Sequence, residues 1–463
     1  MNRGDHVLII GAGTAGTRVA RTLAGAGWRV TVVEHGQFGG NCLWNGCVPK
    51  KALYTAAQTR REAGEAARMG FAGGPAELDW TRLMAWKSEM QRAYAGDQEG
   101  ILRGLGAEVV RSEARFLSPD EVSAGGATYR PSHVLVATGS RPLRPPLPGS
   151  ALADTSDDAL AYPARPATLA IIGGGYIAME FAGIYAAFGT AVTVVMRGGD
   201  VLKGFDREAA ALAQAGLEGL GVSLLLHTET RAIEGVRGDL ELRVAGAAGR
   251  EDALAGERVL AATGRVPAVD DLDLAAGGVE VDERGRPRLD ASLRSRSNPR
   301  VWFAGDAAGG IELTPVAGLE GERVAQSMLT GEPQAVDLAG MPSACFTVPQ
   351  VARVGLGEAE LAARGAPYQV ARGGFEYVAQ AIIDERRGGL VKLLAGEDGR
   401  LLGAHLAGPQ AAELIYTLGL ALRAGATLDD LREARPVHPT LSEALNWAAF
   451  ATETVTPPAR RPG

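Results

Sequence analysis

HVLIIGAGTAG, residues 6–16, decides the fold, because a short apolar run leads directly into a glycine-rich turn. A helix-like segment, TRVARTLAGAG, and a second strand-like run, RVTVVE, come next. A strand, a glycine turn, a helix and a strand in this order predict a βαβ unit. Gly11, Gly13 and Gly16 give the turn the G-x-G-x-x-G pattern. That pattern is typical of dinucleotide-binding turns and predicts a Rossmann-like domain.

The surroundings of this turn favour a ligand, although an isolated G-x-G-x-x-G pattern is a weak signal. The start of the following helix offers unpaired N–H groups and the positive end of the helix dipole to a pyrophosphate. Glu34 ends the second strand, where a carboxylate can bind the hydroxyl pair of a ribose. We expect an ADP-ribose group with a free 2′-hydroxyl at this first site.

The same order of elements returns in TLAIIGGGYIA, residues 168–178. Gly173, Gly175 and Ala178 take the places of the three turn glycines. The chain therefore contains two Rossmann-like units rather than a repeat array. Two dinucleotide sites in one chain predict one bound flavin and one exchanging nicotinamide nucleotide.

The second unit lacks the acidic residue of the first. Met196 stands in place of Glu34, and Arg197 follows it. An arginine pairs with a 2′-phosphate that a carboxylate would repel, and Lys203 lies close enough in sequence to assist. We therefore expect NADPH rather than NADH at the second site, while the reading of Arg197 as a solvated loop charge stays open.

The composition and charge of the chain limit its expected partners and compartment. A net charge of −7 argues against nucleic-acid binding, and no apolar run approaches the roughly 18–20 residues of a membrane span. The first strand-like run begins at residue 6, which leaves no room for a signal peptide. Three cysteines in 463 residues do not make a disulfide-stapled secreted fold. We expect a cytoplasmic protein.

Two of the cysteines, Cys42 and Cys47, lie in GGNCLWNGCVPKK at residues 39–51. In a regular helix five residues rise about 7.5 Å, whereas a disulfide needs Cα atoms within roughly 4.4–6.8 Å. The segment therefore cannot be an undisturbed helix if the pair is to close, and Gly46 and Pro49 supply the distortion. A zinc site would need about four ligands at known spacings, so we expect no metal here.

Two other residues invite a chemical interpretation. His438 opens HPTLSEAL, and Glu443 follows it. An imidazole suits proton transfer to and from thiols, and a carboxylate can hold its tautomer, although alone such a pair is usually an ordinary turn. The third cysteine, Cys345, lies in the apolar run ACFTV, which favours a buried, inert thiol.

GGNCLWNGCVPKKAL resembles the redox-active stretch of the class I pyridine nucleotide–disulfide oxidoreductases. That family includes glutathione reductase, dihydrolipoamide dehydrogenase and mercuric reductase. The motifs VATGS, GGGYIAMEFAG, ATGRVP, FAGDAA and HPTLSEAL follow in the family's order, so the resemblance covers almost the whole chain. It implies an α/β fold with two Rossmann-like domains, for FAD and NAD(P), and a C-terminal α+β dimerisation domain. The domains expected are FAD-binding at 1–149 and 269–340, NAD(P)H-binding at 150–268, dimerisation at 341–452, and a flexible tail at 453–463.

The resemblance also implies roles for individual residues. Cys47 would be the thiolate against the flavin, and Cys42 the thiol that attacks the substrate disulfide. Lys51 would lie near flavin N5 with Glu180 as its ion-pair partner. His438, with Glu443, would reach into the partner subunit's site of an obligate homodimer. Further cofactor contacts expected are Gly40, Thr138, Gly139, Asp306 and Gly264.

The substrate is less sharply indicated. Arg21 falls where many glutathione reductases carry a substrate-binding arginine, but Glu322 stands where they have another one. HPTLSEAL is more similar to dihydrolipoamide dehydrogenase. We expect NADPH-dependent reduction of a low-molecular-weight disulfide, with a dihydrolipoamide dehydrogenase of an acyl-transfer complex or a mercuric-reductase-like enzyme as alternatives.

Overall fold

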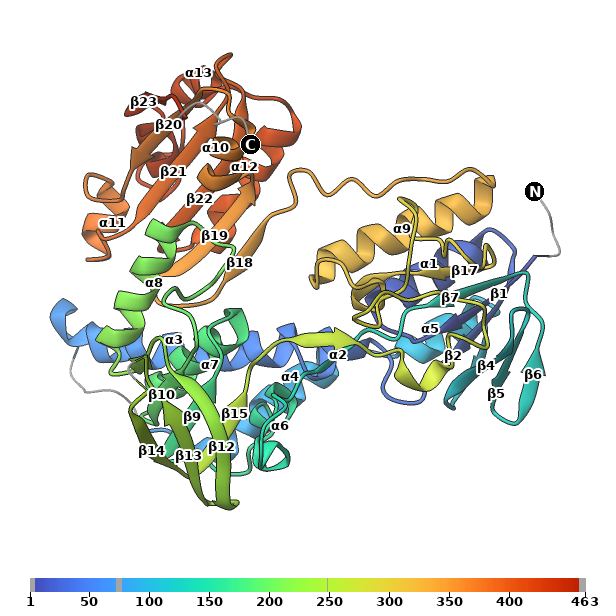
Figure 1. Cartoon of the computed structure of the whole chain (residues 1–463). Helices are drawn as coiled ribbons and strands as arrows, with labels where there is room; N and C mark the ends of the chain where they lie inside the picture. The colour runs from blue at the N-terminus through green and yellow to red at the C-terminus, as the bar shows by residue number, and fades with distance from the viewer. Residues whose placement is uncertain (1–4, 72–76, 248, 458–463) are drawn as a thin grey trace.

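The structure is a computed structural model that describes residues 5–71, 77–247 and 249–457. Figure 1 shows three bodies, coloured blue to teal, green, and orange to red along the chain. The first body also receives strand β17 and helix α9 from far along the sequence, beside α1. This mixed arrangement confirms the predicted α/β fold class.

The first body is built on a parallel five-stranded sheet in the order β17-β7-β1-β2-β3. Both faces of the central strand β1 are buried, because Val7 and Ile9 pack against the helices while Leu8 and Ile10 pack towards a three-stranded antiparallel sheet. The strands are β1 (His6–Ile10), β2 (Arg29–Val33), β3 (Glu108–Val110), β7 (His133–Val136) and β17 (Val301–Phe303), with β4 (Ala114–Ser118), β5 (Glu121–Ala124) and β6 (Ala127–Tyr129) in the antiparallel sheet. The helices are α1 (Thr14–Gly25), α5 (Gln98–Gly104) and α9 (Thr314–Thr330), with the short turns η3 (Asp270–Leu272) and η4 (Gly305–Ala308).

The second body repeats this plan with a parallel sheet in the order β11-β10-β9-β15. A two-stranded ribbon of β8 and β16 lies where the chain crosses between the bodies. The strands are β8 (Ser140–Pro142), β9 (Thr168–Ile172), β10 (Ala191–Val195), β11 (Ser223–Leu225), β12 (Glu229–Val236), β13 (Asp239–Ala245), β14 (Glu251–Gly256), β15 (Arg258–Ala261) and β16 (Arg265–Pro267). The helices are α6 (Ser156–Ala159), α7 (Tyr176–Ala187) and α8 (Arg207–Gly219), with η2 (Ser150–Leu152).

Helices α2 (Gly40–Trp44), α3 (Cys47–Glu65) and α4 (Trp80–Ala95) carry the chain from the first body to the second, with η1 (Ala66–Met69) at the end of α3. Tyr54 of α3 and Trp80 of α4 belong to the same hydrophobic core as Tyr185 of α7. The cysteine stretch is therefore held between the two nucleotide-type bodies. Among the described residues, no helix has the length and apolar character needed to cross a membrane.

The third body is an antiparallel sheet in the order β18-β19-β22-β21-β20-β23. Residues 453–455, expected in a flexible tail, instead pair with β20, so that expectation is wrong for them. The β-branched residues of TETV suit an edge strand. Residues 458–463 of the expected tail lie outside the described residues. The strands are β18 (Ser343–Cys345), β19 (Gln350–Gly355), β20 (Tyr368–Gly373), β21 (Leu390–Ala395), β22 (Leu401–Gly408) and β23 (Thr452–Val455), and the helices are α10 (Glu358–Arg364), α11 (Ala379–Ile383), α12 (Ala411–Arg423), α13 (Leu428–Glu433) and α14 (Glu443–Ala448).

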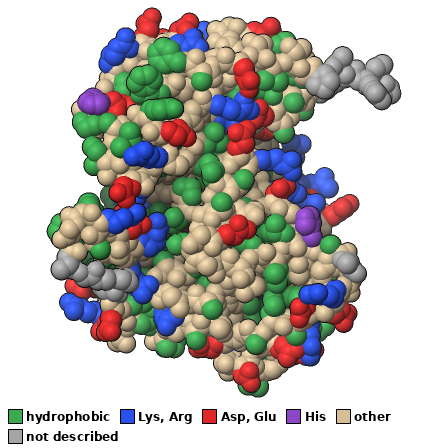
Figure 2. Space-filling model, turned by 90° about the vertical axis from the view of Figure 1, so that its left-hand side faces the viewer, with side chains coloured by type: hydrophobic (Ala, Val, Ile, Leu, Met, Phe, Trp, Pro, Cys, Tyr) green, Lys and Arg blue, Asp and Glu red, His purple; other side chains and the backbone are tan. Residues whose placement is uncertain are grey.

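Large apolar side chains of this third body reach the surface, among them Tyr416, Val437, Trp447 and Phe450, each more than half exposed. Figure 2 shows exposed hydrophobic side chains on the upper part of one face of the molecule. Exposed aromatic groups of this kind favour a surface that a partner covers.

Candidate active site

The two cysteines of GGNCLWNGCVPKK lie on either side of a break between α2 and α3. Gly46 occupies the break, and a Cβ there would lie 2.9 Å from the carbonyl oxygen of Asn41 and 3.2 Å from Cα of Cys42. Only glycine allows the chain to pass so close to itself. The predicted interruption of the helix is confirmed, but Pro49 does not distort it, because Pro49 lies in the first turn of α3, where its missing N–H costs nothing.

Cys42 and Cys47 are free thiols with opposite acidities. A hydrogen bond from Cys42, aided by Thr314 and the charge of Lys50, lowers the pKa of Cys47 to about 6 against the opposing effect of burial. The same hydrogen bond, together with burial, raises the pKa of Cys42. Cys47 also opens α3, where the helix dipole favours an anion. At neutral pH Cys47 is therefore a thiolate and Cys42 a thiol.

Thr314, which the sequence did not single out, lies beside this pair. It opens α9, and its Oγ1 is 3.4 Å from Sγ of Cys47. The start of a second helix is thereby directed at the sulfur atoms. The sequence signal was the Thr-Pro pair that begins the helix after the FAGDAA turn, since proline is common in a first helical turn.

The ion pair expected between Lys51 and Glu180 is made by the neighbouring lysine instead. Nζ of Lys50, not of Lys51, lies 2.7 Å from Oε1 of Glu180, and the two side chains are only 13% and 4% exposed. Glu180 also accepts the backbone N–H of Phe346. Lys51 is one step round the helix, where its Nζ lies 3.7 Å from the centroid of the Phe346 ring, and burial lowers its pKa. A resemblance in sequence could not decide between adjacent lysines, because the direction of α3 selects which one reaches Glu180.

A single cavity of about 740 Å³ joins these groups. It extends from the first glycine turn, past both cysteines, to the second body and the third. Its lining includes both thiols, both lysines and Glu180, together with Gly13, Gly139, Asp306, Thr314, Tyr176 and Lys203.

The first glycine turn fits a dinucleotide. Gly11 has φ +102°, and a Cβ there would lie 2.3 Å from the carbonyl oxygen of Ala137. A Cβ on Gly40 would lie 2.6 Å from Cα of Gly13, so the turn and the cysteine segment approach backbone to backbone. The hydroxyl of Thr138 is buried without a partner among the described residues. These are the features of a cradle for a group that supplies a further polar partner.

Three carboxylates form hydrogen bonds around the first glycine turn. Glu34 is 9% exposed and accepts the N–H groups of Ala12 and Gly36, both at 2.7 Å. Asp306 accepts the Ser140 hydroxyl at 2.6 Å. A further acid, Glu320 of α9, accepts the N–H of Gly305 at 2.7 Å, and burial raises its pKa to about 7. Gly16, the last turn glycine, lies where a Cβ would lie 2.0 Å from the Gly11 carbonyl oxygen.

The second glycine turn has nearly the same geometry. Gly173 has φ +131°, and a Cβ there would lie 2.2 Å from the carbonyl oxygen of Ala262. Gly175 precedes α7, and Ala178 is buried within it. Arg197 and Lys203 are both exposed. The Thr-Gly turn after Ala262 is completed by Gly264, with φ +125°.

The side chain of Met196 packs against the second turn, since a Cβ on Gly174 would lie 2.6 Å from its methyl carbon. A buried thioether thus fills the position where the first body has a carboxylate.

His438 and Glu443 form the expected pair, with Nδ1 of His438 2.7 Å from Oε1 of Glu443. The histidine is 71% exposed, the glutamate only 13%. Neither residue lines the cavity that holds Cys42 and Cys47. One chain therefore does not bring the imidazole to the thiols.

The expected substrate residue, Arg21, also lies outside this cavity. It is exposed and donates a hydrogen bond of 2.5 Å to Gln98, while Glu322 pairs with Arg18 at 3.4 Å. The remaining thiol, Cys345, is fully buried, and burial raises its pKa, in keeping with an inert group.

Comparisons with known proteins agree with this geometry. The model of the pyridine nucleotide-disulphide oxidoreductase family matches residues 5–321, and that of the family's dimerisation domain matches residues 341–449. The chain belongs to this family of flavoprotein disulfide reductases, enzymes that use FAD and a pyridine nucleotide. The dimerisation domain indicates a homodimer.

Two relatives and one solved structure show which members of the family the chain is similar to. The chain is 36% identical to a glutathione reductase from Burkholderia cepacia, covering 94% of this chain and 96% of that one. It is 34% identical to a dihydrolipoyl dehydrogenase from Halobacterium salinarum, covering 97% and 96%. The HOCl-induced flavoprotein disulfide reductase RclA from Escherichia coli has a TM-score of 0.86 at 28% identity, covering 96% of this chain and 99% of that one.

Proposed function

We propose that the chain is an NADPH-dependent reductase of a low-molecular-weight disulfide, working through Cys42 and Cys47. The observation that carries the proposal is the divided acidity of the two thiols inside one cavity. A thiolate with a pKa of about 6 at Cys47 suits the inner, electron-accepting position. A protonated Cys42 suits a nucleophile that a base activates only when a substrate is present.

Bound FAD would supply the electron pair that opens the Cys42–Cys47 disulfide, and NADPH would replenish it. The first turn, Glu34, Thr138 and Asp306 would hold FAD, with Lys50 and Glu180 beside its reactive part. Sequence resemblance had given the lysine role to Lys51. The short Lys50–Glu180 contact in the cavity supports Lys50 instead.

The thiol exchange would proceed in two steps. Cys42 loses its proton to a base and attacks one sulfur of the substrate disulfide, and the other sulfur leaves and takes up a proton. The new mixed disulfide is then broken by Cys47, which attacks Sγ of Cys42. The second product thiolate leaves, and the Cys42–Cys47 disulfide is formed again.

The base in this scheme is His438 of the partner subunit, held by Glu443. Two observations support it: among the residues that the structure describes, no histidine lines the cavity, and the raised pKa of Cys42 demands a base. The exposed imidazole on a dimerisation domain is free to serve a neighbouring subunit.

The exposed Arg197 and Lys203 at the second site support NADPH as the nucleotide. The proposed compartment is the reducing cytoplasm, since a chain of this length with three cysteines is not a disulfide-stapled secreted fold. Dihydrolipoamide dehydrogenase activity is the second candidate function, because the dihydrolipoyl dehydrogenase from Halobacterium salinarum matches nearly the whole chain at 34% identity.

The test is a steady-state panel of disulfides with NADPH and with NADH. The disulfides are those of glutathione, coenzyme A, bacillithiol, cystine and lipoamide, and Hg(II) is added as a non-disulfide acceptor. Efficient NADPH-linked turnover of one small thiol disulfide is expected. If lipoamide with NADH gives the highest kcat/KM, the second candidate replaces the first.

A further inference from the structure

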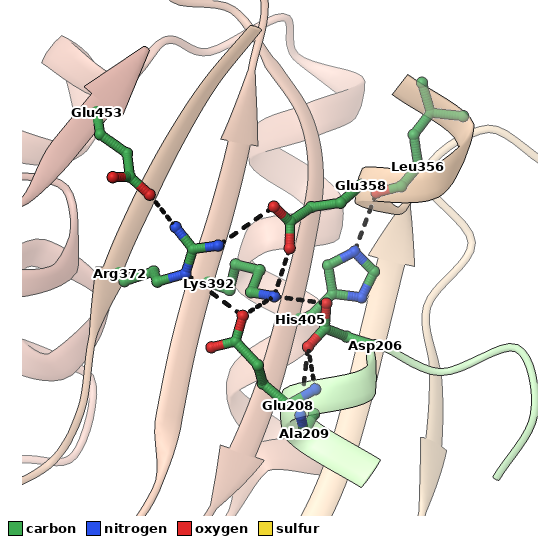
Figure 3. A network of polar contacts seen from close by, with 9 residues as sticks. All are labelled: Asp206, Glu208, Ala209, Leu356, Glu358, Arg372, Lys392, His405 and Glu453. Carbon is green, nitrogen blue, oxygen red and sulfur yellow. Dashed lines mark hydrogen bonds and ion pairs between the residues drawn. The ribbon is translucent and has the colours of Figure 1, made fainter. Parts of the chain in front are cut away.

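An ionic cluster joins the second body to the dimerisation domain, and the buried Lys392 of β21 is its centre (Figure 3). The side chain of Lys392 is 1% exposed. Its Nζ lies 2.7 Å from Asp206, 2.6 Å from Glu208 and 2.6 Å from Glu358. Asp206 and Glu208 belong to the second body, and Glu358 to α10. One buried ammonium group therefore holds carboxylates of two domains.

Arg372 extends this cluster on the neighbouring strand, where it is the register partner of Lys392. It contacts Glu208 at 3.4 Å and Glu358 at 3.2 Å, and it also pairs with Glu453 of β23. Both cations of the cluster therefore lie on the sheet of the dimerisation domain, and the start of α8 places Asp206 and Glu208 against them (Figure 3).

Asp206 connects the cluster to the start of α8. Its Oδ1 accepts the N–H groups of Glu208 and Ala209 at 3.0 and 3.2 Å, while its Oδ2 accepts Nζ of Lys392. A second tether lies two residues earlier, where Arg353 of β19 donates to the carbonyl oxygen of Gly204. The dimerisation domain therefore contacts the last residues before α8 through two cationic side chains.

These residues end the loop of residues 196–206, which carries Arg197 and Lys203. Its backbone is strained at Leu202, which has φ +52° although its side chain is buried. A leucine in the left-handed region persists only where the surroundings hold it. The N–H of Leu202 donates to the carbonyl oxygen of Gly174 at 2.8 Å, so the loop runs from the second glycine turn to the ionic cluster.

We infer that Lys392 and Asp206 are positioning residues for the pyridine nucleotide. The dimerisation domain holds the loop of residues 196–206 in the shape that presents Arg197 and Lys203. Without the lysine, Glu208 and Glu358 keep only Arg372 as an ion-pair partner among the described residues, while Asp206 loses the ammonium group that ties the end of the loop to the sheet. The inference rests on the proposed placement of the nucleotide at the second turn, and it adds a role in nucleotide binding to a domain known for dimerisation.

The experiment uses the FAD-loaded dimer and two variants, Lys392→Met and Asp206→Asn. Asparagine is also a good N-cap, so Asp206→Asn keeps the start of α8 and loses only the charged contact. The Kd of NADP⁺ is measured by titration of the flavin spectrum, with no disulfide present. Lys392→Met should raise it about tenfold and Asp206→Asn several-fold, while kcat at saturating NADPH stays within about twofold. The double variant should fall short of the product of the single effects, because both remove one contact.

Arg400→Met is the matched control. Arg400 lies in the same domain and pairs with Asp398 at an exposed turn, 3.5 Å away, so its ion pair stays within the dimerisation domain. It should leave the Kd unchanged.

An unchanged Kd in Asp206→Asn, with FAD and dimer intact, would overturn the inference even if Lys392→Met does not fold. Equal increases in the KM of the disulfide and of the nucleotide would also overturn it, since they indicate general damage. If instead Gly173→Ala leaves NADP⁺ binding intact, the proposed nucleotide site itself is wrong.

Discussion

The two glycine turns of this chain have almost the same backbone and different surroundings. A Cβ on Gly11 or on Gly173 would come within 2.3 or 2.2 Å of a carbonyl oxygen of the neighbouring Ala-Thr-Gly segment. The strand after the first turn, β2, is followed directly by Glu34, which is buried and bonded to backbone N–H groups. The strand after the second turn, β10, is followed by Met196 and the exposed Arg197. One turn is enclosed and lies beside the cysteines, and the other is open.

The same glycine turn can therefore bind two nucleotides in different ways, depending on the residues around it. Enclosure favours a group that stays bound, whereas an open turn with free cations favours a nucleotide that binds and leaves. Damage at the first turn should abolish the chemistry, and damage at the second should change only which nucleotide is used and how tightly. Matched substitutions at the two turns and at the residues around them test this division.

Gly11→Ala and Gly173→Ala put the same methyl group into the same kind of contact. Gly11→Ala should lose bound FAD, by about tenfold or more in occupancy, because the carbonyl of Ala137 cannot withdraw from the sheet. Gly173→Ala should keep FAD and lose nucleotide affinity. The ratio of flavin to protein absorbance measures the first effect, and NADP⁺ titration the second. Loss of FAD in both variants would break the comparison.

His438→Ala should lower disulfide turnover by about 10²–10⁴, because the proton on Cys42 then lacks its base. Flavin reduction by NADPH, followed by stopped-flow absorbance, should stay near the wild-type rate. Slow flavin reduction would contradict the assignment. Glu443→Gln is the milder companion variant, since it keeps a hydrogen bond to the imidazole and loses the charge.

Arg197→Glu should shift the ratio of kcat/KM for NADPH over NADH towards NADH by about 10–100-fold, the value of a charged hydrogen bond. Thiol chemistry at saturating nucleotide should not change. Equal or better kcat/KM with NADH in the wild-type protein would mean that Arg197 does not bind a 2′-phosphate.

Lys50→Met should lower the rate of flavin reduction about tenfold, whereas Lys51→Met should have a smaller effect. The reason is the 2.7 Å contact of Lys50 with the buried Glu180, which Lys51 does not make. Single-turnover reduction of both variants decides between the two lysines. A larger effect at Lys51 would restore the assignment made from sequence.

Much of this account could be predicted from the sequence, because glycine turns and strand ends have local causes. Gly11, Gly173 and the break at Gly46 follow from steric requirements that only glycine meets. The pairing of His438 with Glu443 follows from a short spacing in the chain.

The rest depends on contacts between distant segments. Thr314 reaches Cys47 from 267 positions away, and Glu180 selects Lys50 over its neighbour from the second body. Lys392 reaches Asp206 from 186 positions away and joins it, with Glu208, to Glu358 of another domain. No local pattern marks such residues, because the tertiary fold brings them together. Residues 453–455 were misjudged for the same reason, since only β20 makes them a strand.

The division between Cys42 and Cys47 is the centre of the account, and one measurement tests it directly. Reduction of the FAD-loaded enzyme by one electron pair should give a long-wavelength band between the flavin and the Cys47 thiolate. Cys42→Ser has no disulfide to reduce, so it should show the band with oxidised flavin before any reduction, whereas Cys47→Ser should show no band before or after reduction. In the wild-type enzyme it should fade as the pH falls through about 6, because protonation removes the thiolate. A band that survives in Cys47→Ser, or disappears only in Cys42→Ser, would contradict the assignment of the two thiols.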